Sequence, residues 1–150
     1  MQSDPVEGLR LRIPADGAAV RAALGALFDT LMLRALPEAT RGTAELVLAE
    51  ALNNIVEHAC APEGGEIELT LSLADGALTC QIVDRGRPMP GGALPVGHLP
   101  PLDPADLPEG GFGWYLIRSL SEELRYERDQ GNNRLTFRVP AQADAKQLSP

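Results

Sequence analysis

The sequence predicts a two-layer α/β sandwich of the α+β class, in which a mixed, mostly antiparallel sheet carries helices on one face. Short segments with strand character occur twice as adjacent pairs, and hairpins of this kind make antiparallel neighbours. Helical segments do not alternate with single strands, which argues against a doubly wound parallel sheet. With 150 residues, of which 44% are hydrophobic, residues 1–150 fit one domain with its own core.

The predicted elements follow the order strand, helix, helix, hairpin, loop, helix, hairpin. Apolar residues in segment 8–13 alternate with arginines, as they do in a half-buried strand. Asp16 is placed to cap a first helix that runs to about Leu36, and Pro37 separates it from a second helix. The remaining predicted elements are that second helix at 38–60, strands at 66–73 and 77–83, a helix at 111–120, and strands at 124–128 and 134–139.

The connections between these elements carry signals of their own. Asp75 and Gly76 form a strong hairpin signal, and residues 130–132 join the last two strands. From 85 to 111 the chain is rich in proline and glycine and has almost no periodic pattern. A loop this long inside a compact domain is usually functional or disordered. We also expect a loose tail at about 141–150.

Composition excludes several classes of function. The chain has 13 basic and 21 acidic residues, a formal net charge of −8, and bulk nucleic-acid binding needs the opposite sign. No apolar run approaches the ~20 residues that cross a bilayer, and the N-terminus lacks the pattern of a secretory signal. We therefore expect a cytoplasmic protein without membrane contact. The two cysteines, Cys60 and Cys80, are too few and too scattered for a disulfide framework or a zinc site.

The basic residues are nearly all arginine, and the only lysine is Lys146, near the C-terminal end. P-loop and protein-kinase-like sites both place a lysine on the phosphates of the nucleotide. Any phosphoryl-transfer site in the body of this chain must therefore work without a lysine.

The second predicted helix carries a polar stripe. Glu50, Asn54 and His58 are spaced by four and lie on one face, one turn apart. A carboxylate and a carboxamide one turn apart offer the oxygen ligands that Mg²⁺ prefers, and the carboxylate could also accept a proton from an attacking hydroxyl. Taken alone, the same stripe is typical of the solvated face of an amphipathic helix.

Two further motifs flank the long loop rich in proline and glycine. Asp84 and Gly86 stand at the end of a hydrophobic strand, where a carboxylate can accept from an exocyclic amine and glycine lets the backbone approach a ligand. Gly110, Gly111 and Gly113 lead into an apolar helix, whose N–H groups can converge on a phosphate. Taken alone, these motifs could be an ordinary Asp-x-Gly turn and a flexible helix start.

The three motifs, in this order, resemble those of the GHKL ATPases, which have the Bergerat fold. Within them the chain is most similar to the RsbW/SpoIIAB type of anti-sigma factor and serine-protein kinase. Segment 50–58 resembles the N box of the family, 84–86 its G1 box and 110–117 its G2 box. The resemblance spans roughly residues 9–139. It implies that about 87–109 form a lid over the nucleotide, although the many prolines of this segment depart from the family pattern.

The resemblance implies a set of residue roles. Asn54 would ligate Mg²⁺, and Glu50 would act as general base. Asp84 would receive the adenine amine, with Thr136 assisting from the last strand. The glycines that would approach or hold ATP or ADP are Gly86, Gly110, Gly111 and Gly113.

The resemblance also implies a function. The chain would be a serine/threonine-protein kinase and anti-sigma factor that phosphorylates a STAS-domain anti-anti-sigma factor, binds a sigma factor and forms a homodimer. Two alternatives stay open. One is a nucleotide-dependent module that binds a sigma factor or another regulator without kinase turnover, and the other is the ATP-binding half of a histidine kinase.

Overall fold

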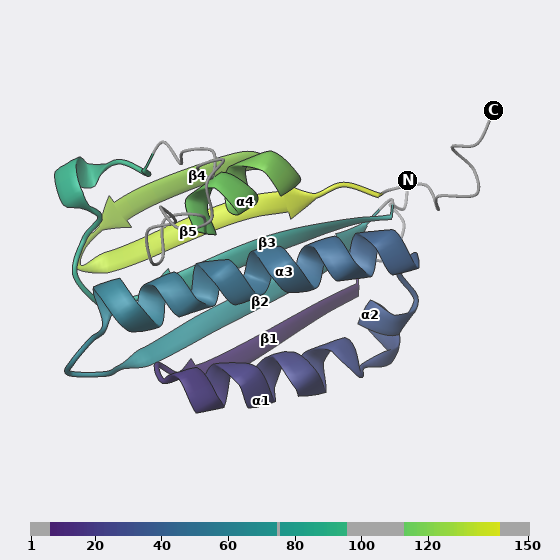
Figure 1. Cartoon of the computed structure of the whole chain (residues 1–150), viewed down its shortest axis with the longest axis horizontal. Helices are drawn as coiled ribbons and strands as arrows, with labels where there is room; N and C mark the ends of the chain where they lie inside the picture. Colours follow the sequence, from purple (N-terminus) through teal and green to yellow (C-terminus); the bar gives the residue numbers. More distant parts are fainter. Residues whose placement is uncertain (1–6, 75, 96–112, 142–150) are drawn as a thin grey trace, which may run out of the picture.

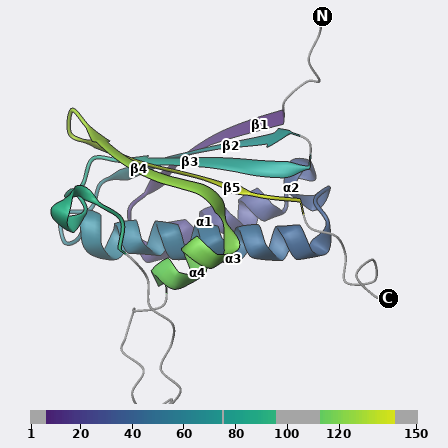
Figure 2. The ribbon, with the colours of Figure 1, turned by 90° about the horizontal axis from the view of Figure 1, so that it is seen from above.

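The computed structural model of the chain describes residues 7–74, 76–95 and 113–141. The chain forms two layers, a five-stranded sheet and a layer of helices that lies across it (Figure 1). Seen from above, the helices all lie on one side of the sheet and leave its other face uncovered by the described residues (Figure 2). This arrangement confirms the predicted fold class.

The sheet is antiparallel throughout its described part, whereas a mixed sheet was expected. Its strand order is β1-β2-β3-β5-β4, and each of its neighbouring pairs runs antiparallel. The strand that follows β3 in the sequence is β4, at the edge of the sheet, and a tight hairpin then leads to β5, which pairs with both. The described part of the long connection from β3 to β4 consists of residues 85–95 and the last helix. The strands are β1 (Glu7–Pro14), β2 (Glu66–Ala74), β3 (Ala77–Asp84), β4 (Glu122–Asp129) and β5 (Asn132–Val139).

The first helical segment is divided into two helices, so the prediction of one helix to Leu36 was wrong. Asp16 caps the first helix as predicted, and its Oδ1 accepts from the backbone N–H of Ala19 at 2.8 Å. Thr30 is extended (φ −73°, ψ 155°) and caps the second helix. Ser, Thr, Asn and Asp side chains compete with the backbone in this way and favour caps over helix interiors. The two helices are α1 (Gly17–Phe28) and α2 (Leu31–Arg34).

The second predicted helix is confirmed, with a change of geometry at its end. It consists of α3 (Glu38–Asn54) and one π-helical turn, η1 (Ile55–Ala59), which is closed by the N–H of Cys60 bonding to the carbonyl of Ile55 at 2.9 Å. Single π-helical turns inside helices are frequent at functional sites. The remaining helices are the short 3₁₀ turn η2 (Pro90–Gly92) and α4 (Gly113–Leu120).

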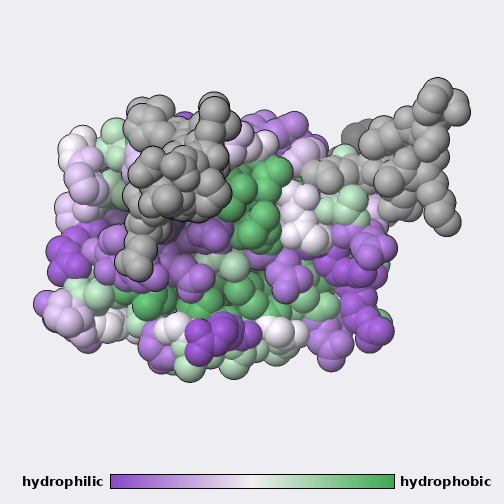
Figure 3. Space-filling view, viewed as in Figure 1, coloured by the Kyte–Doolittle hydropathy of each residue, from purple (hydrophilic) through white to green (hydrophobic). Residues whose placement is uncertain are grey.

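The core lies between the inner face of the sheet and α1 and α3. Alternate residues of the strands point to it, and α3 buries a stripe of apolar side chains against them. Hydrophobic surface is visible as a band between the two long helices, flanked by hydrophilic side chains (Figure 3). The central core residues are Val47, Leu48, Ala51, Leu52, Ile67, Leu69, Leu78, Ile82, Phe137 and Val139.

The outer face of the sheet is polar. Cross-strand ion pairs join Arg10 to Glu68 at 3.6 Å and Arg138 to Glu122 at 2.8 Å. Exposed pairs of this kind contribute little to stability, so they mark a solvated face. Among the described helices, none is both long and apolar enough to cross a bilayer.

Two leucines of α3 test this account of the core. Leu48 is 0% exposed and Leu46 is 40% exposed. We expect Leu48→Ala to lower the free energy of unfolding by about 2–5 kcal/mol, because it removes methyl groups and leaves a cavity. Leu46→Ala is the matched control and should stay within about 0.5 kcal/mol. Urea unfolding monitored by circular dichroism measures both, and equal losses would contradict the packing described.

Candidate functional site

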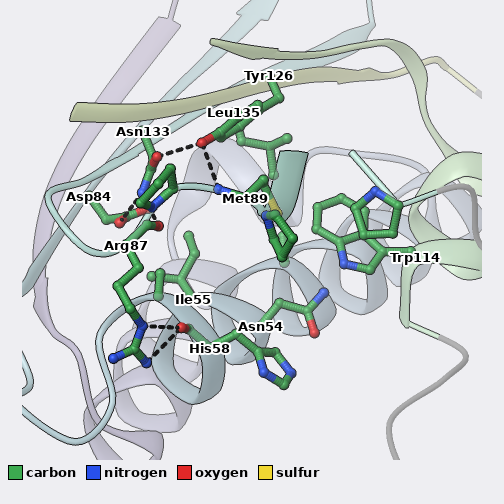
Figure 4. A pocket seen from close by; sticks show the side chains of 15 residues that line it. Asn54, Ile55, His58, Asp84, Arg87, Met89, Trp114, Tyr126, Asn133 and Leu135 are labelled. Atoms are coloured by element: carbon green, nitrogen blue, oxygen red, sulfur yellow. Dashed lines mark hydrogen bonds between the residues drawn. The ribbon is translucent and has the colours of Figure 1, made fainter. Parts of the chain in front are cut away.

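A pocket of about 510 Å³ opens between the inner face of the sheet and the end of α3 (Figure 4). Its walls are largely apolar and come from the helix, the segment after β3, the start of α4 and the last two strands. A few polar side chains lie among them. Pockets that combine apolar walls with a few placed polar groups are typical of small-molecule sites. The residues used below are Asn54, Ile55, His58, Asp84, Arg87, Met89, Trp114, Tyr126, Asn133 and Leu135.

Asp84 supplies the buried carboxylate of the pocket. It is the last residue of β3 and only 4% exposed, because it continues the inward-facing series of the strand. Its Oδ1 accepts two hydrogen bonds, from the backbone N–H of Gly86 at 2.8 Å and from Nδ2 of Asn133 at 2.9 Å. The described residues make no hydrogen bond to its Oδ2. One acceptor oxygen therefore remains available on the wall of the pocket.

Asn133 is a site residue that the sequence analysis missed. It lies directly opposite Asp84 in the register of β3 and β5 and is 5% exposed. Residues opposite each other on one face of a sheet are in contact distance, so the pairing brings the carboxamide to the carboxylate. The sequence does contain a sign of this role. Asn133 stands two positions before Leu135, so it is a polar residue in the alternating series that faces the core.

Thr136 does not belong to the pocket, so its expected assistance at the adenine is corrected. Asn133 and Leu135 line the pocket. Since successive side chains of a strand point to opposite faces, Thr136 lies on the outer face, where it pairs with Gln81 of β3. In the described structure the polar neighbour of Asp84 on the last strand is Asn133.

The polar stripe of α3 meets the start of α4. A Cβ added to Gly113 would lie 2.8 Å from Oε2 of Glu50 and 3.4 Å from Nδ2 of Asn54. Nδ2 of Asn54 is buried and has no hydrogen-bond partner among the described residues. An orphan buried donor of this kind is rare and requires an explanation, such as a ligand. The predicted neighbourhood of Glu50, Asn54 and Gly113 is thus present, while Gly110 and Gly111 lie outside the described residues.

Arg87 fixes the segment after β3 to the end of the helix. Its Nη2 donates to the carbonyl of His58 at 2.9 Å and also to that of Ala61, and its backbone N–H donates to the carbonyl of Ala59 at 2.9 Å. A cation at the C-terminal end of a helix also interacts favourably with the helix dipole. The guanidinium therefore has a structural role here, and the side chain of His58, one turn after Asn54, stands exposed at the pocket rim.

The backbone at Gly86 lies close to another part of the chain, at Ala59, rather than to a ligand. A Cβ at this position would lie 2.3 Å from the carbonyl oxygen and 2.6 Å from the carbonyl carbon of Ala59. Only glycine permits this contact, which joins the end of β3 to the end of η1. The Asp-x-Gly motif thus aligns two parts of the pocket with each other.

Cys60, directly after η1, is a buried free cysteine close enough to Asp84 to feel its charge. Burial raises the pKa of the Cys60 thiol, and the nearby Asp84 charge raises it further, while Arg87 opposes both. The thiol is therefore neutral at pH 7. The described residues hold no group of three or more His, Cys, Asp or Glu side chains that could bind a metal ion.

The segment predicted to form a lid is described only at its beginning. Residues 87–95 line the pocket in part and make contacts with α4, where Nε of Arg118 donates to the carbonyl of Pro95 at 2.7 Å. The rest of the predicted lid, to residue 109, lies outside the described residues, as does the predicted tail beyond Ala141.

Comparison with known protein families shows to which family the chain belongs. The family described as the histidine kinase-like ATPase domain matches residues 13–139. The chain belongs to this family. The match confirms the GHKL resemblance and covers the end of β1, all of β2 to β5 and the residues that line the pocket.

Relatives within the histidine kinase-like ATPase family include proteins named serine-protein kinase RsbW from Bacillus thuringiensis (strain Al Hakam) and Bacillus mycoides (strain KBAB4). Each is 32% identical over 90 residues. The matched segment is 58% of this chain, and it spans only 56% of the length of either relative.

Solved structures show the same fold at low identity. One holds the RsbU and RsbW domains of Rv1364c from Mycobacterium tuberculosis, with a TM-score of 0.64 and 20% identity, and covers 93% of this chain and 34% of that one. Another is the histidine kinase domain of the blue-light activated histidine kinase EL346 from Erythrobacter litoralis. It has a TM-score of 0.52 and 20% identity, and it covers 85% of this chain and 61% of that one. At this identity they establish the fold alone.

Gly86 offers a test of the contact that aligns the site. Gly86→Ala should lower the free energy of unfolding by about 1–3 kcal/mol, because the new methyl group meets backbone atoms that cannot move aside cheaply. Gly25→Ala in α1 is the control, since a Cβ there meets nothing within 4 Å, and it should be neutral or stabilising by up to ~1 kcal/mol. Chemical unfolding distinguishes the two, and a neutral Gly86→Ala would refute the close approach.

Proposed function

We propose that the chain binds ATP with Mg²⁺ in this pocket and acts as a serine/threonine-protein kinase and anti-sigma factor. Its substrate would be a STAS-domain anti-anti-sigma factor, and its other partner a sigma factor. The observation that carries the proposal is that Asp84 and Asn54 line one pocket and that Gly113, from a third part of the chain, lies beside Asn54. Membership of the histidine kinase-like ATPase family and the relatives named serine-protein kinase RsbW support it.

The chemistry of the pocket fits an adenine base. Oδ2 of Asp84 offers an acceptor with no partner among the described residues, and the exocyclic amine of adenine is a donor. Ile55, Met89 and Leu135 add apolar walls that suit a flat ring (Figure 4). A guanine in the same orientation would present its carbonyl oxygen to the carboxylate, and two acceptors repel each other.

The residues at the start of α4 fit the phosphates and Mg²⁺. The orphan Nδ2 of Asn54 is a donor that a phosphate oxygen would satisfy, and its Oδ1 is an oxygen ligand of the kind that Mg²⁺ prefers. The space beside Gly113 is one that a Cβ would fill, and the N–H groups at a helix start favour anions. When bound, Mg²⁺ neutralises phosphate charge during transfer. Asn54 would hold it together with the phosphates themselves.

Transfer requires a base for the attacking hydroxyl. The serine or threonine oxygen of the partner forms a bond to the γ-phosphorus while the bond between that phosphorus and the β,γ-bridging oxygen breaks, and ADP leaves. Glu50, one helical turn from Asn54, would take the hydroxyl proton. The described part of the chain contains no lysine, so positioning by Asn54 and the start of α4 would replace the lysine of other kinases.

Nucleotide binding is the first property to test. ADP with Mg²⁺ at about 100-fold over its dissociation constant should add roughly 2.7 kcal/mol of stability, which corresponds to several degrees in Tm. Asp84→Asn should abolish the shift, because it replaces an acceptor on the pocket wall with an amide that can keep the internal hydrogen bonds. Asp129→Asn, at the exposed end of β4, is the control and should keep it. Absence of any shift in the unaltered chain would end the proposal.

Kinase action is a separate test, because a regulator-binding module would also bind ATP. With radiolabelled ATP and purified STAS-domain proteins, Glu50→Gln should lower phosphoryl transfer at least ~100-fold and leave ADP affinity nearly unchanged. Glu57→Gln, exposed on the same helix, should leave both unchanged. Acid-stable label on serine or threonine supports the kinase, while acid-labile phosphohistidine or no transfer would favour the two alternative functions.

A further inference from the structure

Four residues form a hydrogen-bonded network from Met89, in the segment after β3, to the buried carboxylate. The backbone N–H of Met89 donates to Oη of Tyr126 at 3.0 Å, and Oη donates to Oδ1 of Asn133 at 2.6 Å. Nδ2 of Asn133 then donates to Oδ1 of Asp84 at 2.9 Å. The network can be followed in Figure 4, where the Tyr126 hydroxyl lies between the other members. The only one of the four outside the sheet is Met89, so the sheet holds the segment after β3 through this residue.

The donors and acceptors in this hydrogen-bonded network can be assigned from its fixed groups. A backbone N–H can only donate, so the Tyr126 hydroxyl accepts from Met89 and gives its own hydrogen to Asn133. Nη1 of Arg128, which has no acceptor, also donates to Oδ1 of Asn133, at 3.0 Å. Both donors face the carbonyl end of the carboxamide. The amide end therefore points at Asp84, and the opposite orientation would bring two acceptor oxygens together.

We propose that Tyr126 and Asn133 are positioning residues that determine base selectivity by holding the Asp84 carboxylate in one orientation. The inference rests on the proposed function and adds to it the group that distinguishes a 6-amino purine from a 6-oxo purine. Neither side chain needs to touch the edge of the base. Tyr126 acts on Asp84 through Asn133.

Selectivity for adenine follows from the hydrogen bonds that occupy Oδ1 of Asp84. Because Gly86 and Asn133 both donate to Oδ1, the carboxylate cannot rotate without losing two hydrogen bonds, and Oδ2 stays directed at the pocket. A fixed acceptor pairs with the amine of adenine. Hypoxanthine carries a carbonyl at that position and its nearest donor on N1, so a fixed carboxylate cannot follow it. A carboxylate released from Asn133 could turn and bind either base.

The same side chains hold the wall of the pocket. Nδ2 of Asn133 also donates to the carbonyl of Arg87 at 2.9 Å, and Nη1 of Arg128 donates to that of Gly86 at 2.7 Å. Loosening this wall would weaken the binding of both purine nucleotides to a similar extent. A selective role and a merely structural role therefore differ in their effect on the ratio of the two affinities.

The test is the ratio of dissociation constants for IDP and ADP, measured with Mg²⁺ by isothermal titration calorimetry on the full chain. Tyr126→Phe keeps the aromatic wall and removes the hydroxyl, and we expect the preference for ADP to fall roughly fivefold, as for the loss of one hydrogen bond in a network. The control is Tyr115→Phe. Tyr115, the only other tyrosine, is half-buried on α4 and does not line the pocket.

A second variant covers the case in which Arg128 alone still orients the carboxamide. Arg128→Met combined with Tyr126→Phe removes both donors to Oδ1 of Asn133, and the preference should fall further than in Tyr126→Phe. An unchanged ratio in both variants, or equal weakening of ADP and IDP, would overturn the inference while leaving the proposed function intact. Failure of the unaltered chain to bind ADP would overturn both.

Discussion

The buried carboxylate of Asp84 is the constraint on which the rest of the site depends. A carboxylate that is 4% exposed must have hydrogen-bond partners, since an unpaired buried charge costs several kcal/mol. Its partners come from two places, the turn at Gly86 and the opposite strand at Asn133. The first requires a sharp turn directly after β3, and the second requires the register in which Asp84 faces Asn133. The path of the chain after β3 and the pairing of β3 with β5 are therefore tied to one side chain.

A second constraint links this strand end to the helix. Gly86 lies against the carbonyl of Ala59, and Arg87 bonds the carbonyl groups at the end of η1, so the turn and the helix end hold each other in place. One consequence is that Asn54, a turn earlier on the helix, faces the same space as Asp84. Motifs that are 30 residues apart in the sequence become the two walls of one pocket through backbone contacts that involve no ligand.

Periodicity was sufficient to predict the first three strands and the long helix, because burial on one face imposes periods of 2 and 3.6. It was not sufficient to assign the last strand. The predicted strand began at residue 134 and left Asn133 in the turn, so the pairing of Asn133 with Asp84 could not be foreseen. Thr136 was then chosen by resemblance, although it lies in the outward phase. The break at Thr30 was missed for a related reason. Apolar spacing continues across it, and only the capping preference of threonine marks the boundary.

The network around Asn133 joins two properties that a nucleotide-binding domain could otherwise vary independently. The carboxamide holds the group proposed to recognise the base, and it also holds the segment after β3 through the carbonyl of Arg87. Tyr126 holds the same segment through Met89. In the proposed function, a substitution that frees this segment and speeds nucleotide release would also release the Asp84 carboxylate. Fast nucleotide exchange and strict choice of adenine would then depend on the same hydrogen bonds, and a change in one would alter the other unless the β4–β5 hairpin supplied a replacement donor.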